Sequence, residues 1–357
     1  MGVVGSSGPS DPAGARWDLS EEQTLPWDDV KQIFRPETVH MGVVTVDREK
    51  CTKCGLCIEN CPFRAWEEDE DGFPRQKGQY ECFSCYNCMV PCPVDAISIV
   101  DAYHVDAGFY ATDPHPLPAK MPFEPRDEEG NLDEWNGIER AVFHRRSVRN
   151  FKDKPVPETI VRRVLEAGRF APSAGNCQPW KFIVVTNKAL LHEMNEGICN
   201  ALSMLLTMYK NDEMVKTLAP MYEADPRPGS WDPRVVLGGF GAVAKRELPV
   251  FLNAPVVILI AGDERAISGP EINVGICGQN MNLVANSLRI KACWVGFSQV
   301  INNIAPLKEK LGVRDPWRIV SAMVLGYPKF KQEGMVPRMF RPVTWFRPGS
   351  DEPQIEE

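Results

Sequence analysis

The sequence has no apolar run long enough to cross a membrane, and its longest, residues 254–261, has the length of a buried strand. The N-terminus lacks the basic residues and following apolar stretch that direct secretion. An excess of positive charge is also absent. The formal net charge is −8 and the pI is about 5.4, which argues against a general binder of nucleic acids or anionic membranes. We therefore expect a cytoplasmic protein with no membrane span and no nucleic-acid partner.

Two features of many enzymes are missing as well. No G-x-G-x-x-G follows a strand pattern, so a dedicated dinucleotide fold is not expected, although a nicotinamide can still enter another pocket. Histidine is rare, and its positions show no spacing typical of metal ligands or of a catalytic triad. The five histidines are His40, His104, His115, His144 and His192. We therefore assign no catalytic role to a protein side chain.

Cysteine, by contrast, is abundant and unevenly placed. Eight of the twelve cysteines fall within residues 51–92, in two runs with the spacing C-x2-C-x2-C-x3-C-P. Disulfides do not fit this placement, and a zinc site leaves the third cysteine of each run unexplained. The spacing is typical of two [4Fe–4S] clusters in which the fourth cysteine of each run ligates the other cluster. One cluster then takes Cys51, Cys54, Cys57 and Cys92, and the other takes Cys82, Cys85, Cys88 and Cys61.

The segment that holds these runs resembles bacterial two-cluster ferredoxins. The other four cysteines are scattered through the rest of the chain. Cys199, Cys277 and Cys293 fall on apolar faces and are expected in the core. Cys177 is open to two interpretations, a redox role or the packing of a small side chain.

Composition divides the rest of the chain. Five prolines between Asp113 and Pro125 favour a stiff linker. Helical and strand patterns alternate after it, except in an irregular stretch typical of a lid or binding loop. The expected organisation is a tail at 1–40, the two-cluster domain at 41–105, the linker at 106–133, an α+β domain at 134–345 with a lid insertion at about 211–248, and a tail at 346–357. Within the α+β domain, periodicity predicts helices at 157–168, 190–209 and 272–288 and strands at 180–185, 256–261 and 319–325.

Three arginines and a serine are concentrated in the segment 144–151, which reads H-R-R-S-V-R-N-F. Guanidinium groups this close together suit a phosphate dianion, although arginines on a polar helix face give the same pattern. Further motifs follow in order. They are A-P-S-A-G-N-C-Q-P-W at 171–180, a long helix around Asn280, A-C-W-V-G-F at 292–297, G-Y-P at 326–328 and P-R at 337–338.

With these motifs, residues 140–340 resemble the FMN-dependent nitroreductase superfamily. The resemblance implies a three-layer domain, with a central, mostly antiparallel sheet flanked by helices. It also implies an obligate homodimer with FMN at the interface, where the helix around Asn280 lies. By the same resemblance, the phosphate and ribityl chain are held by Arg145, Arg146, Ser147 and Arg149, with Arg338 at the phosphate end. The ring is approached by the loop residues Pro172, Ser173, Ala174 and Asn176 and by the backbone of Val295 and Gly296.

Clusters move single electrons, whereas FMN exchanges hydrides or single electrons. A chain with both is expected to take electrons from an external ferredoxin or another low-potential carrier and to reduce a small organic acceptor. A nitro compound, an activated C=C bond and a halogenated ring are the candidate acceptors. The alternatives are the reverse flow, in which FMN oxidises a substrate and the clusters export electrons, and an electron-transfer subunit, which has no use for a lid. Expected substrate contacts are Met208, Tyr209, Tyr222, Trp231 and Phe240, with lid packing as the alternative.

Overall fold

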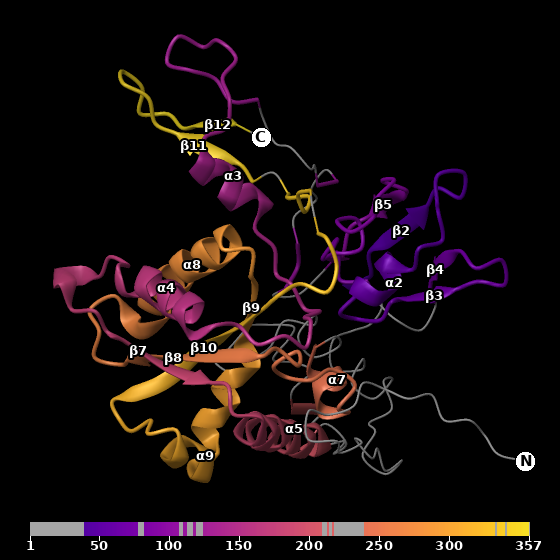
Figure 1. The fold of residues 1–357 in the computed structure, drawn as a ribbon. Coiled ribbons are helices and arrows are strands. Elements are labelled where there is room, and N and C mark those ends of the chain that lie inside the picture. Colours follow the sequence, from indigo (N-terminus) through magenta and orange to yellow (C-terminus); the bar gives the residue numbers. More distant parts are fainter. Residues whose placement is uncertain are drawn as a thin grey trace, which may run out of the picture. The chain divides into compact units, whose positions relative to one another are not determined.

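The computed structural model describes residues 39–77, 82–106, 110–112, 117–118, 124–208, 213, 216–217, 239–332, 334–339 and 341–356. The described chain forms two compact units (Figure 1). The larger unit comprises described residues from 145 to 332. The smaller unit comprises described residues from 39 to 144 and from 334 to 356.

The larger unit is built on a four-stranded antiparallel sheet with the order β7-β8-β10-β9. Its strands are β7 (Trp180–Val185), β8 (Val256–Asp263), β9 (Lys291–Val295) and β10 (Trp317–Gly326). All eight residues of β8 are buried, because a central strand covered on both faces exposes neither set of its alternating side chains. The sheet therefore forms the middle layer of the domain.

Helices cover both faces of this sheet (Figure 1). On one side lie α4 (Glu158–Arg169) and α8 (Gly269–Ser287), and their buried apolar residues join alternate residues of β8 in one core cluster. On the other side lie α5 (Lys188–Met208) and the short α7 (Gly241–Ala244) and α9 (Ala305–Lys310). The 3-10 segments are η4 (Ala174–Asn176) and η6 (Gly296–Asn303). The predicted three-layer α+β fold is confirmed.

The predicted helices and strands are all present, and the ends of all but one are shifted. The strand at 180–185 has the expected bounds, whereas β8 and β10 are longer than predicted. Pro157 is the N-cap residue of α4 and does not lie in its first turn. Helix α8 begins at Gly269, before the predicted start, because Pro270 fits the first helical turn. Most of the lid insertion at 211–248 lies outside the described residues.

Helix α8 packs closely against the sheet at Gly278. A β-carbon at this position would overlap the indole ring of Trp294 on β9. We expect Gly278→Ala to lower the free energy of unfolding by about 1–3 kcal/mol, because a packed core has no room for an added methyl group. Denaturant unfolding measures this change. The Trp294→Phe background is the control, since it removes the overlapping ring atoms. An equal cost in both backgrounds would contradict the packing explanation.

The smaller unit contains short strands in antiparallel pairs. Strand β2 (Val43–Val46) pairs with β5 (Ile97–Asp101), and β3 (Trp66–Glu68) pairs with β4 (Pro74–Gln76). The pairing of β1 (Val39–His40) with β6 (His104–Val105) lies beyond the outer ends of β2 and β5. The helix α2 (Leu56–Asn60) connects to β3, and Val44, Trp66, Tyr86 and Ile97 share one core cluster.

The smaller unit also includes segments outside the cysteine-rich part. They are helix α3 (Gly137–His144) and the hairpin of β11 (Val343–Trp345) with β12 (Gln354–Glu356). The predicted C-terminal tail at 346–357 therefore contains a strand. Part of the predicted linker is described too, and it holds a tight turn at Asp127–Asn131 flanked by the bridge between Arg126 and Leu132. Among the described residues, no helix combines the length and apolarity needed to cross a bilayer.

Candidate functional sites

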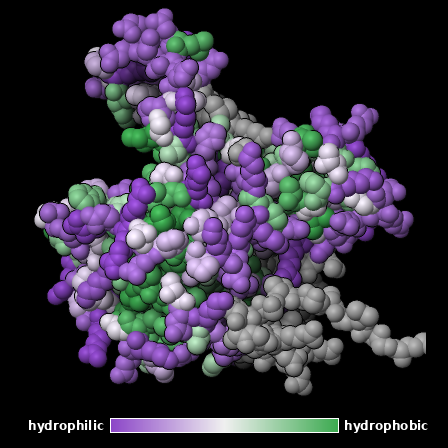
Figure 2. Space-filling model, in the orientation of Figure 1, coloured by the Kyte–Doolittle hydropathy of each residue, from purple (hydrophilic) through white to green (hydrophobic). Residues whose placement is uncertain are grey.

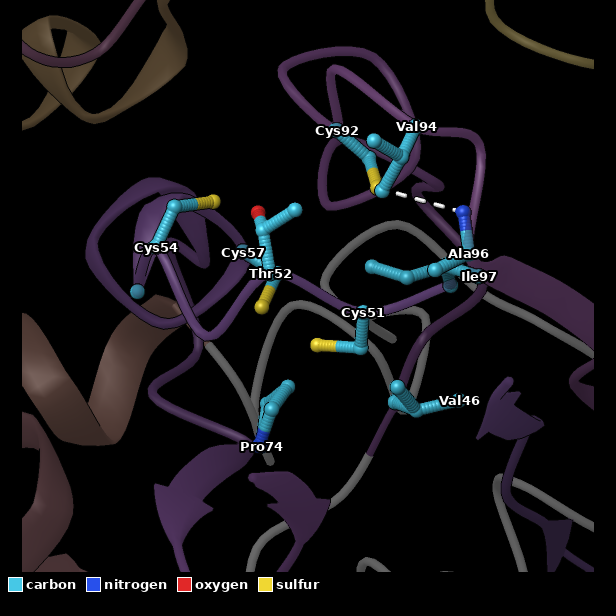
Figure 3. Close-up of a pocket in the computed structure, with 11 residues that line it drawn as sticks. Val46, Cys51, Thr52, Cys54, Cys57, Pro74, Cys92, Val94, Ala96 and Ile97 are labelled. Carbon is cyan, nitrogen blue, oxygen red and sulfur yellow. Dashed lines mark hydrogen bonds between the residues drawn. The ribbon is translucent and has the colours of Figure 1, made fainter. Parts of the chain in front are cut away.

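Four cysteines from the two runs line one pocket of the smaller unit (Figure 3). Cys51, Cys54 and Cys57 come from the first run, and Cys92 comes from the end of the second. The pocket is completed largely by apolar residues, among them Val46, Val94 and Ile97. An apolar wall around thiol ligands is what an iron–sulfur cluster requires to be shielded from water. The residues therefore fit a cluster, and they are the four that the spacing predicts for it.

The remaining four cysteines of the runs also lie near one another. Burial, together with the charges of Cys85 and Cys61, raises the pKa of Cys82 to about 11. Burial also raises the pKa of Cys88 well above its usual value, with Cys85, Cys82 and Cys61 among the groups that add to the rise. Cys61, from the first run, thus lies among the first three cysteines of the second. Binding a cluster here must displace protons from these thiols.

The two runs repeat one backbone geometry. Lys53, Gly55 and Arg64 have positive φ angles. Their counterparts in the second run, Ser84, Tyr86 and Asp95, have positive φ angles as well. The fourth cysteine of each run accepts a hydrogen bond from the backbone N–H four residues later: Ala65 N donates to Cys61 Sγ at 3.3 Å, and Ala96 N donates to Cys92 Sγ at 3.2 Å. Such N–H donors stabilise negative charge on sulfur and so favour cluster binding.

Gly42 lies against the second run. Its N–H donates to the carbonyl of Cys82 at 2.7 Å, and a β-carbon would overlap Ser84 Oγ and come within 3.1 Å of the same carbonyl. We expect Gly42→Ala to displace Cys82 and to lower the iron bound per chain by up to half. Iron analysis of anaerobically reconstituted protein checks this. The control is Val43→Ala at the neighbouring, exposed residue, which should retain full iron. Full iron in Gly42→Ala would contradict the prediction.

The arginine segment lies along β9 in the larger unit. Ser147 forms a parallel bridge with Ala292, and the N–H of Val148 donates to the carbonyl of Ala292 at 3.0 Å. Side chains of an extended segment alternate between faces. Accordingly, Arg146 and Val148 are buried, with exposed fractions of 2% and 0%, whereas Arg145, Ser147 and Arg149 are partly exposed. The structure thus separates Arg146 from the three residues predicted with it.

The surroundings of the Cys293 thiol on β9 show where the side chains of Arg145, Ser147 and Arg149 lie. Burial raises its pKa, while the positive charges of Arg149 and Arg145 and a hydrogen bond with Ser147 act to lower it. All three side chains therefore converge on the same part of β9. Two guanidinium groups and a hydroxyl from three partly exposed residues match the donors that bind a phosphate dianion.

Lys291, at the start of β9, adds a further cation that the sequence motifs did not reveal. Burial lowers its pKa, and the nearby charge of Arg146 lowers it further. Two cations held close together favour an anion beside them. Lys291 lies in no motif, and only the pairing of the arginine segment with β9 places it here. At the other end of the strand, Val295 is buried and Gly296 is exposed, and the space where a β-carbon of Gly296 would lie is open, with no atom within 4 Å apart from its chain neighbours.

The loop after α4 is exposed and conformationally strained. Gly175, Asn176 and Gln178 have positive φ angles, and a hydrogen bond from Gln178 N to Ser173 Oγ at 2.9 Å closes the turn. Pro172, Asn176 and Cys177 are exposed, and Ser173 and Ala174 are partly exposed. The packing interpretation of Cys177 therefore does not hold within this chain. Cys199, Cys277 and Cys293 are buried as predicted.

The remaining predicted contacts are placed as follows. Arg338 belongs to the smaller unit, and its Nη1 donates to the carbonyl of Pro337 at 3.3 Å. Phe240 is fully buried, which favours packing for this residue. Met208 ends α5, and its side chain lies outside the described part of the structure, as do Tyr209, Tyr222 and Trp231.

Known proteins resemble both parts of the chain. Nitrobenzene nitroreductase from Ectopseudomonas oleovorans is 26% identical over 208 residues, which cover 53% of this chain and 86% of that protein. The NADH dehydrogenase of Thermus thermophilus is 45% identical over 57 residues, which cover 16% of this chain and 28% of that protein. A solved nitroreductase with bound FMN from Desulfitobacterium hafniense is 22% identical, with a TM-score of 0.43, and the match covers 57% of this chain and 96% of that one.

Two family models match the chain. The model of the 4Fe-4S dicluster domain matches residues 43–93. The model of the nitroreductase family matches residues 142–327, which is just over half of the chain. These matches confirm both resemblances and the oxidoreductase class predicted from the sequence. The chain belongs to the nitroreductase family and carries a 4Fe–4S dicluster domain on its N-terminal side.

Proposed function

We propose that this protein is an iron–sulfur flavoprotein that passes electrons between two [4Fe–4S] clusters and FMN to reduce a small organic acceptor. One observation carries the proposal. A single chain contains both a pocket lined by Cys51, Cys54, Cys57 and Cys92 and an open face on β9 where Arg145 and Arg149 converge. The first site suits a carrier of single electrons, and the second suits a phosphate-bearing cofactor.

The group formed by Arg145, Ser147 and Arg149, called here the arginine face, supports FMN as that cofactor. FMN ends in a phosphate dianion, which Arg145, Ser147 and Arg149 are arranged to bind. Lys291 and the buried Arg146 add positive charge behind them. At the far end of β9, the exposed backbone of Gly296 leaves room for a flat ring. When bound, FMN supplies both hydride transfer and single-electron transfer.

The protein residues then have distinct tasks. The arginine face holds and orients the cofactor, while the thiolates of the cysteine sites hold clusters that accept electrons from an external ferredoxin or a similar low-potential carrier. No side chain has to act as a nucleophile. A nitro compound, an activated C=C bond or a halogenated ring is the acceptor class that such chemistry serves.

A homodimer completes the proposed site. The loop Pro172–Asn176 is largely exposed. Four large apolar side chains are exposed as well: Phe170 just after α4, Val184 on β7, and Ile272 and Ile276 on α8. Figure 2 shows apolar side chains exposed on the face of the larger unit that carries α4 and β7. Exposed apolar surface of this kind favours association. Sedimentation of the wild type and of Ile276→Glu tests this: the wild type should be dimeric, and the variant should dissociate. A monomeric wild type would contradict it.

The function is tested on protein purified and reconstituted without oxygen. We expect about eight irons and about one FMN per chain. After reduction with dithionite, nitroaromatics, enones and halophenols are offered in turn, and at least one class should reoxidise the flavin. Absence of flavin would overturn the proposal. Failure of all three classes would favour a role in electron transfer without a substrate.

A further inference from the structure

Three side chains of the smaller unit converge outside the two cysteine runs. His40 on β1 lies directly opposite His104 on β6, and their rings are stacked with centroids 4.4 Å apart and planes 11° apart. Asp106 follows His104 by two residues, so both side chains lie on the same side of the chain. All three residues are within the smaller unit.

Their donor atoms are close enough to share one ion. Asp106 Oδ2 lies 2.5 Å from His40 Nε2, and Asp106 Oδ1 lies 3.6 Å from His104 Nε2. One donor atom from each residue lies within 4.8 Å of the other two. A tetrahedral zinc ion with bonds of about 2.0–2.1 Å holds its ligands roughly 3.3 Å apart. The observed separations lie on both sides of that value, so small side-chain rotations would suffice.

The hydrogen bonding of His104 sets the orientation of its ring. Its Nδ1 lies 2.9 Å from the carbonyl oxygen of Ala102, which can only accept a hydrogen bond. Nδ1 therefore carries the proton, and in the neutral ring Nε2 presents a lone pair toward the Asp106 carboxylate. Either a proton on Nε2 or a metal ion beside it would relieve the repulsion between this lone pair and the carboxylate. A histidine whose other nitrogen donates to a carbonyl is the usual form of a metal-bound histidine.

We propose that His40, His104 and Asp106 form a binding site for a divalent first-row metal ion of the zinc class, with water completing the coordination. Imidazole and carboxylate ligands suit such ions. The three side chains are 38–56% exposed, so an ion can reach them from solvent.

The place of this site in the fold suggests what the metal does. Strand β1 precedes β2, and β6 follows β5. The segment between His40 and His104 contains all eight cysteines of the two runs. An ion shared by the ends of this segment closes a long loop and binds only the folded form, so it stabilises the domain that holds the clusters.

Zinc binding to the full-length, cluster-loaded protein tests the proposal, because the cluster cysteines are then occupied. Calorimetry with zinc chloride should show one tight site per chain, and zinc should raise the unfolding temperature. X-ray absorption spectroscopy at the zinc edge of this complex should show only nitrogen and oxygen ligands, at about 2.0–2.1 Å. No binding, or sulfur among the ligands, would overturn the proposal.

Variants locate the site. His40→Gln and Asp106→Asn should each weaken zinc binding by about 10- to 100-fold while the iron content stays unchanged. His144→Gln is the matched control, since it removes an exposed histidine of the same unit, and it should bind zinc like the wild type. Equal zinc affinity in all three variants would contradict the assignment. Loss of iron in one variant leaves the other variant and the wild-type spectrum to decide.

Discussion

Serine in place of Cys92 is expected to remove one of the two clusters and to lower the iron content from about eight to about four per chain. Cys92 belongs to the second run in sequence, but it lines the pocket of the first-run cysteines Cys51, Cys54 and Cys57. Its loss therefore removes a ligand from the cluster that those three cysteines hold. The other cluster, with Cys61 as its fourth ligand, should persist.

The reciprocal variant makes this prediction specific. Cys61→Ser should also halve the iron, but it should spare the cluster in the pocket of Figure 3. Iron analysis, together with electron paramagnetic resonance of the reduced proteins, distinguishes the loss of one cluster from the loss of both. Each variant should show one isolated signal, whereas two neighbouring clusters in the wild type interact. The matched control is Cys177→Ser, which changes an exposed cysteine outside the runs and should retain all the iron. Loss of both clusters in each variant would contradict the expectation that each cluster binds without the other.

Alanine in place of Arg145 is expected to weaken FMN binding by about 10- to 100-fold, which corresponds to about 1.5–3 kcal/mol for a hydrogen bond to a charged group. The charges of Arg145 and Arg149 both act to lower the pKa of the Cys293 thiol, so their guanidinium groups lie near the same part of β9. Replacing both arginines with alanine should weaken FMN binding more than either single substitution and should yield protein without flavin. Fluorescence titration of the apoprotein with FMN measures the affinity.

Two controls separate phosphate binding from general damage. Arg162→Ala removes an exposed arginine of α4 that pairs with Glu158 one helical turn earlier, and FMN affinity should not change. Riboflavin has no phosphate, so its binding should be the same in wild type and in Arg145→Ala. If Arg145→Ala weakens riboflavin and FMN equally, the arginine does not bind the phosphate.

The cysteine sites were predictable because their ligands are local. The three predicted ligands at the start of each run lie within seven consecutive residues, and the exchange of the fourth is what the two-cluster pattern predicts. The repeated positive φ angles at Lys53 and Ser84 were not predictable, since neither residue is glycine. They follow from wrapping the chain around a cluster-sized space.

The arginine segment shows where sequence reasoning stops. The composition of residues 145–149 predicted a phosphate cradle, but it did not reveal that Arg146 points inward. That orientation arises because the segment is extended and bridged to β9 at Ser147, and alternation then buries Arg146 and Val148. Lys291 was missed for the same reason, since only strand pairing brings it close to Arg146.

The histidines give the clearest case of information that sequence spacing does not contain. His40 and His104 show no ligand spacing along the chain, and the sequence predicted no role for them. The register of β1 with β6 places them opposite each other. The register of β1 with β6 depends on how the whole segment between them folds, so no local sequence pattern predicts it.

The central claim is that the clusters and FMN of this chain exchange electrons during reduction of a substrate. Freeze-quench paramagnetic resonance tests it most directly. The reduced protein is mixed without oxygen with an acceptor that reoxidises the flavin, and the cluster signals are followed in wild type and in the flavin-free variant lacking Arg145 and Arg149. We predict that the cluster signals disappear within turnover in the wild type and persist in the variant. Equal decay in both proteins, or persistence in both, would contradict the claim.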